Sequence, residues 1–287
     1  MTNINQDGIW LDNLEELSAK KIFDGFFGGV RKKFGQNFLF DEKINRKIVS
    51  VAGDLTGKVV AEVGPGPGGL TLEILKQDIK KLYVIELDPH WSEVWRNLAR
   101  LFNGKLEVIE QDALGFCFKN ISPHAIISNL PYNISTQLLF KWLEEFHLYE
   151  CLVLTFQKEV ADRLRAKPST KAYGKLSVLT QWKSRVSKAF DLKAGAFFPA
   201  PEVKSTAMKF IPYGANDMYA NFNLFSNLLT AAFQHPRKVV IKSLSKFLQN
   251  PEDSLLKLGY GKNARAGEIA LDDYIEILSE FLRTRNL

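Results

Sequence analysis

The stretch "VVAEVGPGPGG", Val59 to Gly69, joins an apolar, valine-rich run to a turn that holds four glycines and two prolines. Leu70, Ile74 and Leu75 follow at helical spacing, so the turn leads from a strand into a helix. Glycines permit a tight turn and let the backbone approach a ligand, and the helix N-terminus adds amides and positive partial charge. Because the spacing fits both G-x-G-x-G and G-x-G-x-x-G, the turn predicts a nucleotide-type cofactor without selecting one.

Short β-rich runs alternate with helical segments on both sides of this turn. Each run is nearly continuous in apolar character and is separated from the next by enough chain for a crossover, which is typical of a parallel sheet covered by helices on both faces. The sequence therefore predicts an α/β fold, with a mixed sheet of another topology as the alternative. The predicted strands are Val59–Val63, Leu82–Glu86, Leu106–Ile109, Ala125–Ser128 and Cys151–Phe156.

The character of the chain changes before and after these strands. Residues 39–51 have helical spacing with Asp41 as a plausible N-cap, and the alternation over 203–210 predicts an antiparallel strand that closes the sheet. "IPYGAND", residues 211–217, has the composition of a linker. Beyond it, helical periodicity predicts helices over 222–233, 239–248 and 271–282. We predict an N-terminal extension (1–30), an α/β domain (31–211) and a small all-helical domain (212–287).

Composition limits the classes of function. The formal net charge of +6 and the pI of about 9.1 favour an anionic partner, nucleic acid above all. Two cysteines, Cys117 and Cys151, offer neither a metal-ligand spacing nor a disulfide framework, which predicts a reducing cytoplasm and no metal. The N-terminus lacks the pattern of a signal peptide, and no apolar run is long enough to span a membrane.

Polar residues follow the predicted strands where a parallel sheet binds its ligands. Glu86 ends the second strand about twenty residues after the glycines and can accept both hydroxyls of a ribose, a group that NAD and S-adenosylmethionine share. Asp112 follows the third strand and can accept a hydrogen bond from an adenine amine, or it can cap a helix. Asn129 ends the fourth strand.

The corner "NLPY", Asn129 to Tyr132, has the groups that N-methylation of adenine needs. The exocyclic nitrogen is a poor nucleophile, so a site must accept hydrogen bonds from its N–H groups and aim its lone pair at the methyl. Asn129 offers a side-chain carbonyl, Leu130 before Pro131 an extended backbone carbonyl, and Tyr132 a face for a flipped-out base. The alternative is an ordinary proline turn with a packing tyrosine.

Ordered motifs along the chain resemble those of the ribosomal RNA adenine N6,N6-dimethyltransferase family. The resemblance covers nearly everything from residue 31 onward and implies a Rossmann-like class I methyltransferase sheet followed by a helical domain that recognises RNA or the ribosome. The motifs are "KFGQNFLFD" (33–41), "EVGPGPGGLT" (62–71), "VIELD" (84–88), "QDA" (111–113), "NLPYNIST" (129–136), "QKEVADRL" (157–164), "AYGKLSV" (172–178), "FFPAPEVKS" (197–205), "AFQHPRKVVIKSL" (232–244) and "ARAGEIALDDY" (264–274).

The resemblance also implies roles for individual residues. Asn129, Leu130, Pro131 and Tyr132 would form the catalytic corner, and Phe197 would lie on the other side of the target base. The residues implied to bind S-adenosyl-L-methionine are Gln36, Asn37, Leu39, Gly64, Gly66, Glu86, Asp112 and Asn129.

The C-terminal motifs are similar to the branch of the family that acts on small-subunit (16S) ribosomal RNA. This similarity implies dimethylation of adenines, two adjacent ones, in RNA within an assembling small subunit. It implies phosphate contacts by Lys158, Arg163, Arg165, Arg237 and Lys238. One departure is Pro236, after His235, which is expected to interrupt a helix and to re-aim the basic pair behind it.

Three other functions are compatible with parts of the sequence. A ribosome-assembly factor for which methylation is secondary would share every motif. An NAD-dependent dehydrogenase would share the glycine-rich turn but gives no role to residues 129–132. A DNA adenine methyltransferase would share the methylation chemistry but fits the C-terminal motifs poorly.

Overall fold

A computed structural model of the 287-residue chain describes residues 17–26, 36–214 and 221–285. The chain divides into two compact units. The first comprises residues 1–158 and 187–212, and the second comprises residues 159–186 and 213–287. Each unit has its own buried core.

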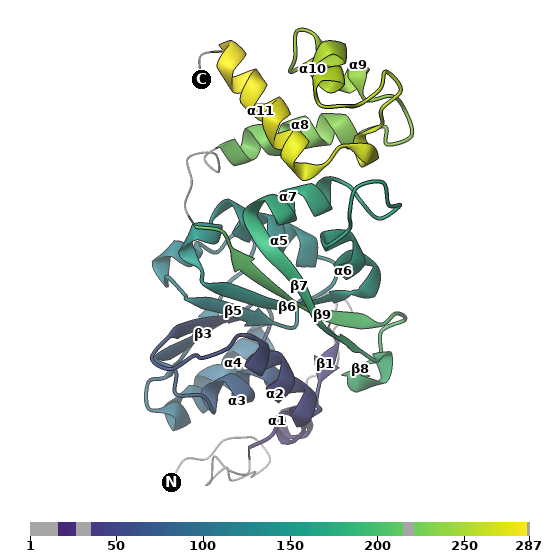
Figure 1. Cartoon of the computed structure of the whole chain (residues 1–287). Helices are drawn as coiled ribbons and strands as arrows, with labels where there is room; N and C mark the ends of the chain where they lie inside the picture. The colour runs from purple at the N-terminus through teal and green to yellow at the C-terminus, as the bar shows by residue number, and fades with distance from the viewer. Residues whose placement is uncertain (1–16, 27–35, 215–220, 286–287) are drawn as a thin grey trace. The chain divides into compact units, whose positions relative to one another are not determined.

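The first unit is built on a seven-stranded sheet in the order β4-β3-β2-β5-β6-β9-β7 (Figure 1). Strands β2 to β6 are parallel, and β9 runs antiparallel to β6. All five predicted parallel strands are present, with ends within one residue of those expected, and the predicted closing strand is β9. The strands are β2 (Val59–Val63), β3 (Lys81–Glu86), β4 (Leu106–Glu110), β5 (Ala125–Ser128), β6 (Cys151–Gln157), β7 (Ser184–Leu192) and β9 (Ser205–Pro212).

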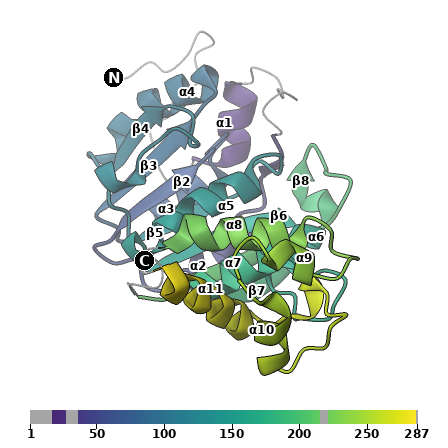
Figure 2. The ribbon, with the colours of Figure 1, turned by 90° about the horizontal axis from the view of Figure 1, so that it is seen from above.

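Helices cover both faces of this sheet, as predicted. Helices α2, α3 and α4 lie on one face and α5 on the other (Figures 1 and 2). Asp41 caps α2 as expected, because its side chain accepts a hydrogen bond from the Ile44 amide at 3.1 Å. The elements are α1 (Ala19–Gly25), α2 (Glu42–Val51), α3 (Gly69–Leu75), α4 (Pro89–Ala99), α5 (Ser135–Glu144) and the short 3₁₀ turns η3 (Arg100–Phe102), η4 (Phe118–Asn120), η5 (Phe146–Leu148) and η6 (Ala194–Ala196).

A second, two-stranded sheet joins distant parts of the first unit. Strand β1 (Phe38–Leu39) pairs antiparallel with β8 (Phe197–Phe198), so that Leu39 lies opposite Phe197. Helix α1, from the part of the chain that resembled nothing, places Phe23 against Phe38 with ring centroids 5.7 Å apart. The remainder of the N-terminal extension, 1–16 and 27–30, lies outside the described residues.

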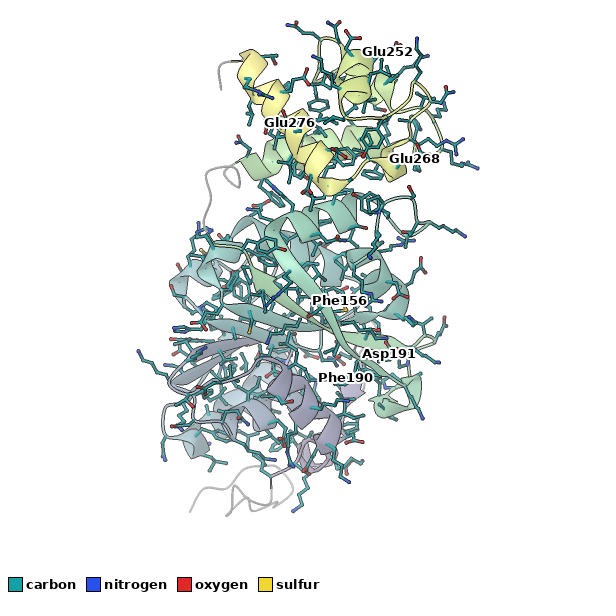
Figure 3. The ribbon with its side chains drawn as sticks, in the orientation of Figure 1. Phe156, Phe190, Asp191, Glu252, Glu268 and Glu276 are labelled. Atoms are coloured by element: carbon teal, nitrogen blue, oxygen red, sulfur yellow. The ribbon has the colours of Figure 1, made fainter. Side chains whose placement is uncertain are left out.

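Apolar strands form the core of the first unit. Every residue of β5 is buried, and so is all of β6 except Gln157, because helices cover both faces of a parallel sheet. Phe156 of β6 packs edge-on against Phe210 of β9 with centroids 6.0 Å apart (Figure 3). At the edge of the sheet, Asp191 accepts a hydrogen bond from the Thr206 hydroxyl at 2.7 Å.

The second unit is helical. Its core is formed by Phe225, Leu228 and Leu229 of α8 together with Tyr274 and Ile277 of α11. Ion pairs lie on its surface, such as Glu276 with Arg283 at 2.5 Å and Glu252 with Lys262 at 2.8 Å (Figure 3). Its helices are α6 (Lys158–Leu164), α7 (Lys175–Lys183), α8 (Phe222–Phe233), α9 (Ile241–Leu244), α10 (Pro251–Lys257), η8 (Ala266–Glu268) and α11 (Leu271–Arg285).

The prediction of a helix over 239–248 is wrong in length, because the observed helix is shorter. Helix α9 covers only Ile241–Leu244, because Val239 pairs with Arg265 in an isolated antiparallel bridge and the Val240 amide donates to the Ala264 carbonyl at 2.9 Å. Helix α8 ends at Phe233, before Pro236, in agreement with the expected interruption.

The domain boundaries inferred from sequence stay a prediction. Residues 159–186, assigned by sequence to the α/β domain, group by compactness with the C-terminal helices. Among the described helices, none combines the length and apolar character that crossing a membrane requires.

Candidate active site

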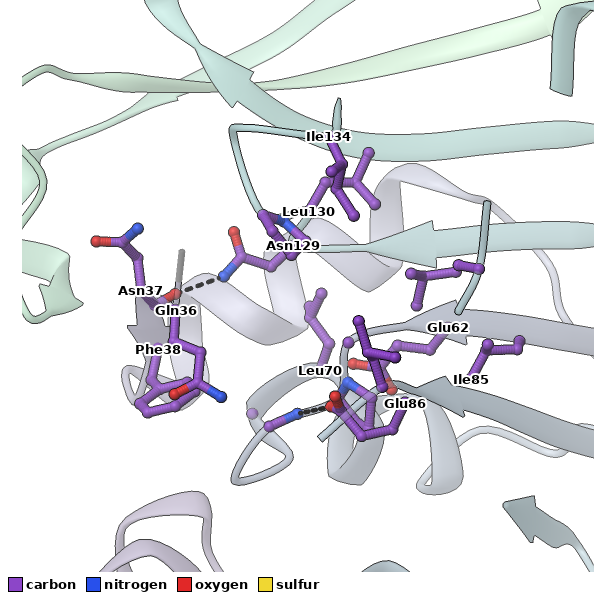
Figure 4. A pocket seen from close by; sticks show the side chains of 18 of the residues that line it. Gln36, Asn37, Phe38, Glu62, Leu70, Ile85, Glu86, Asn129, Leu130 and Ile134 are labelled. Atoms are coloured by element: carbon purple, nitrogen blue, oxygen red, sulfur yellow. Dashed lines mark hydrogen bonds between the residues drawn. The ribbon is translucent and has the colours of Figure 1, made fainter. Parts of the chain in front are cut away.

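A pocket that is partly open to solvent lies at the carboxyl ends of the parallel strands (Figure 4). All eight residues predicted to bind the cofactor line it, and so do Leu130 and Pro131 of the catalytic corner. The structure therefore brings together residues that are widely separated in sequence. The lining segments are 36–39, 62–67, 69–70, 85–87, 111–114, 129–131 and 133–134, together with Asn45.

The glycines of the turn are needed for packing inside the protein as well as for the close approach of the backbone to the pocket. Gly66 and Gly68 both have left-handed backbone conformations, with φ of 50° and 91°. A Cβ atom on Gly66 would lie 2.8 Å from the Phe38 ring, and one on Gly68 would lie 2.0 Å from the Trp95 ring. The indole of Trp95 also donates to the Gly66 carbonyl at 2.7 Å, so α4 holds the turn in place.

Glu86 lies at the floor of the pocket, where its carboxylate is largely removed from water. Its Oε1 accepts from the Asp88 amide at 2.8 Å, and its Oε2 is 3.5 Å from the Gly66 amide. Burial raises the pKa of Glu86 to about 7, although these amides act in the opposite direction. The carboxylate is thus held beside the glycine turn (Figure 4).

A second buried carboxyl, Glu62, lines the same pocket and was missed by the sequence analysis. Its Oε2 accepts from the Thr71 hydroxyl at 2.7 Å. Burial, with a smaller contribution from the charge of Glu86, raises the pKa of Glu62 to about 8. The sequence signal that could have identified Glu62 is its position as an acidic residue within an otherwise apolar strand, two residues before the first glycine.

These two carboxyls fit S-adenosylmethionine. A ligand that brings positive charge and hydroxyl donors compensates acids buried away from water. S-adenosylmethionine carries a sulfonium, an ammonium and a ribose, and so matches the donors and acceptors that the pocket offers.

Asp112 is exposed at the rim of the pocket, and its Oδ1 accepts from the Leu114 amide at 2.9 Å. No helix begins directly behind it, so Asp112 closes a turn rather than capping a helix. Lys141 of α5, which the sequence analysis also missed, donates to the carbonyls of Ala113 and Leu114 at 3.1 and 2.6 Å. Partial burial lowers the pKa of this lysine. Lys141 thereby fixes the loop that carries Asp112.

The amide of Asn129 is held from two sides. Its Nδ2 donates to the Asn37 backbone carbonyl at 2.9 Å (Figure 4), and its Oδ1 accepts from the Thr155 hydroxyl at 2.6 Å. The preceding residue, Ser128, donates through its hydroxyl to the Val63 carbonyl at 2.6 Å, which ties the end of β5 to the end of β2. The corner is therefore anchored on both neighbouring strands.

Two predicted catalytic residues do not line this pocket. Tyr132 is half-buried, and its hydroxyl hydrogen-bonds to that of Ser205 at the start of β9. Burial raises the pKa of Tyr132. Phe197 is buried in β8, opposite Leu39. Their contact with a target base stays a prediction.

The predicted RNA-binding residues all lie on or beside helices of the second unit. Arg163 is exposed and pairs with Glu159 at 2.6 Å, and Arg165 is exposed just after α6. Arg237 and Lys238 are exposed in the turn that follows α8, and Lys158 begins α6. No three potential metal-ligating side chains gather anywhere in the described ranges.

This fold and this pocket define a class I methyltransferase that uses S-adenosylmethionine. The model of the ribosomal RNA adenine dimethylase family matches residues 29–282, and the chain belongs to that family. The sequence-based predictions of the fold, the methyl donor and the enzymatic class are therefore confirmed.

Curated relatives and solved structures support this assignment. The ribosomal RNA small subunit methyltransferase A of Paramagnetospirillum magneticum is 41% identical over 266 residues, 92% of each chain. The protein of the same name from Ruegeria sp. is 37% identical over 92% of this chain and 95% of its own. A dimethyladenosine transferase from Plasmodium falciparum superposes with a TM-score of 0.75 at 27% identity, over 86% of this chain and 98% of that one. The 23S rRNA methyltransferase ErmE shares the fold, with a TM-score of 0.64 at 22% identity over 85% and 99% of the two chains.

Replacing Gly68 by alanine is expected to destabilise the first unit by about 3 kcal/mol, because the new methyl group would both strain the backbone and collide with Trp95. Gly57→Ala is the matched control, since Gly57 has φ of 68° but nothing within 4 Å of an added Cβ. It should cost only about 1 kcal/mol of backbone strain. Urea unfolding measures both, and equal losses would contradict the packing role of Gly68.

The raised pKa of Glu62 predicts a dependence of stability on pH. The folded state keeps the proton up to about pH 8, whereas the unfolded carboxyl releases it near 4.5. The stability that protonated Glu62 contributes is complete below pH 4.5 and is lost as pH rises towards 8. Unfolding at a series of pH values should therefore show that Glu62→Gln declines less than wild type over this range. Glu107→Gln, on an exposed part of β4, is the control for the loss of one acid, and a Glu62→Gln curve parallel to wild type would contradict the assignment.

Proposed function

We propose that this protein dimethylates the exocyclic N6 of adenines in small-subunit ribosomal RNA, two adjacent ones, during assembly of the subunit in the cytoplasm. The observation that carries the proposal is the Asn129 amide, fixed by two hydrogen bonds at the edge of the cofactor pocket. The names of relatives 37 to 41% identical over 92% of the chain support the small subunit as the source of the RNA.

The chemistry is positioning rather than acid–base catalysis. The Asn129 side-chain carbonyl and the Leu130 backbone carbonyl would accept the two N–H groups of the target amine and aim its lone pair at the methyl. Tyr132 and Phe197 would enclose the base. Bound S-adenosylmethionine supplies a methyl group on a positively charged sulfur. Once methylated, the nitrogen is acidic enough to lose its proton to water, so no side chain need act as a strong base.

The remaining predicted residues would hold the methyl donor. Glu86 suits the ribose hydroxyls and Asp112 the adenine amine, since both carboxylates line the pocket. Gly64 and Gly66 allow the backbone to come close, and Gln36, Asn37 and Leu39 line the same pocket.

Contacts with RNA phosphates are proposed for four exposed basic residues of the second unit and for Lys158, which is partly exposed at the start of α6. Lys158, Arg163 and Arg165 would act from α6, and Arg237 and Lys238 from the turn after α8. Such contacts set the position of a folded RNA and carry little sequence information.

Replacing Asn129 by alanine tests the proposed chemistry. Loss of a hydrogen-bond acceptor that acts in the transition state should reduce methyl transfer about 100-fold. The assay incubates the protein with labelled S-adenosylmethionine and immature small subunits, large-subunit RNA or DNA, and then identifies the modified nucleosides. Asn120→Ala, on the exposed turn η4, is the matched control.

N6,N6-dimethyladenine in small-subunit RNA alone is the expected product. Labelling of DNA alone, or of no nucleic acid, would refute the proposal. Full complementation of a deletion strain by Asn129→Ala would instead indicate that assembly, without methylation, is the main role.

Binding to small-subunit RNA is expected to weaken steeply as salt rises, because phosphate contacts release counterions. Replacing Arg237 and Lys238 together by alanine should make the slope of log K against log salt shallower by roughly 2. Arg283→Ala is the matched control, because that exposed guanidinium pairs with Glu276 at 2.5 Å. Filter binding at several salt concentrations measures the slopes, and an unchanged slope in the double variant would exclude these contacts.

A further inference from the structure

Thr155 is a polar residue in the centre of the most apolar strand of the sheet. It is fully buried in β6, where Leu152, Val153, Leu154 and Phe156 are also fully buried. A β-branched residue suits a strand, but valine would serve packing equally well without a hydroxyl to satisfy. The hydroxyl therefore has a use that packing does not explain.

The register of the sheet places this hydroxyl at the catalytic corner. Strand β5 ends at Ser128, which pairs with Leu154 of β6. The next residue on each strand is Asn129 and Thr155, and the Thr155 Oγ1 lies 2.6 Å from the Asn129 Oδ1. Strand β6 continues to Gln157, whereas β5 ends at Ser128. The Thr155 side chain can therefore hydrogen-bond to Asn129, which lies just beyond the end of β5.

The chemistry of the partners fixes the direction of both hydrogen bonds. A backbone carbonyl can only accept, so the amide atom 2.9 Å from the Asn37 carbonyl must be Nδ2. The other atom, Oδ1, then faces Thr155, whose hydroxyl must donate. Turning the amide over would set two acceptors against each other at Asn37 and would lose that hydrogen bond. The two contacts together allow a single orientation.

We propose that Thr155 is a positioning residue that orients the Asn129 amide and thereby sets the efficiency of the second methyl transfer relative to the first. This role rests on the function proposed above. A carbonyl oxygen has two lone pairs. Thr155 takes one of those on Oδ1, which leaves the other for an N–H of the target amine.

The two transfers depend on Asn129 to different degrees. In each, the lone pair of N6 forms the bond to the methyl carbon, sulfur keeps the electron pair of the bond that breaks, and one N–H proton passes to water. The first transfer begins with two N–H groups, which Asn129 and the Leu130 carbonyl accept together. The second begins with one N–H. A single hydrogen bond must then hold the amine, so a loosened acceptor impairs the second transfer more.

Thr155→Val removes the hydroxyl and keeps the shape of the side chain, whereas Thr155→Ser keeps the hydroxyl. Single-turnover reactions on immature small subunits, followed by digestion, give the rate constants for the monomethylated and the dimethylated adenine. For Thr155→Val we expect the ratio of the second rate constant to the first to fall roughly tenfold, the value of one hydrogen bond. Monomethyladenine should accumulate, and Thr155→Ser should stay near wild type.

Binding of S-adenosylmethionine, measured by calorimetry, should change less than about twofold in Thr155→Val, because Thr155 does not line the cofactor pocket and the Asn129 Nδ2 contact with Asn37 stays in place. Thr180→Val is the matched control. Thr180 is likewise fully buried, and its hydroxyl has no hydrogen-bond partner within the described part of the chain. If Thr155→Val fails to fold, Thr155→Cys serves the same purpose, since a thiol is a weak donor of similar size.

A wild-type ratio of the two transfers in Thr155→Val, at any overall rate, would overturn the role of Thr155. So would a Thr155→Ser variant as impaired as Thr155→Val, since packing would then be the cause. Absence of N6-methylation by the wild-type protein would overturn the proposed function, and this role with it.

Discussion

One side-chain amide joins three segments of the chain that are far apart in sequence. Asn129 leaves the sheet at the end of β5, donates to the carbonyl of Asn37 and accepts from Thr155 of β6. The first contact fixes the segment that covers the cofactor pocket, and the second fixes the amide to the centre of the sheet. The same amide is proposed to hold the target amine. A displacement of Asn37 or Thr155 would therefore change the position of the target amine relative to the methyl group.

The floor of the pocket presents a different constraint. Glu62 and Glu86 are both buried, and burial raises the pKa values of both, to about 8 and about 7. Each carboxyl is satisfied only in part, by Thr71 in one case and by backbone amides in the other. A cationic ligand with hydroxyl groups relieves this cost. The two buried carboxyls therefore lower the stability of the ligand-free protein, and binding of the methyl donor offsets this cost. Binding sites commonly reduce stability in this way in return for function.

The sequence predicted the features that depend on local pattern, such as the strands, and missed those that depend on tertiary contacts. Continuous apolar runs located β2 to β6 to within a residue, most clearly β5 and β6, which are buried along nearly their whole length. The helix over 239–248 failed because a bridge from Val239 to Arg265 outweighs helical periodicity. Lys141 and Thr155 went unnoticed, because their roles lie in contacts with Leu114 and Asn129 that no spacing reveals. Glu86, Asp112 and Asn129 were found because they follow the carboxyl ends of parallel strands, whereas the roles of Gln36, Asn37, Leu39 and Phe197 came only from the family resemblance.

The glycine-rich turn shows how the cofactor pocket and the target site depend on one another. Phe38 packs so closely on Gly66 that no side chain fits between them. The same strand, β1, pairs with β8, which carries Phe197. The residue before Phe38 holds the Asn129 amide. The three-residue segment 37–39 thus contacts the glycine turn, the proposed base-binding segment and the catalytic corner. A shift of this segment at one of the contacts would disturb the other two, so the cofactor pocket and the catalytic corner depend on the same three residues.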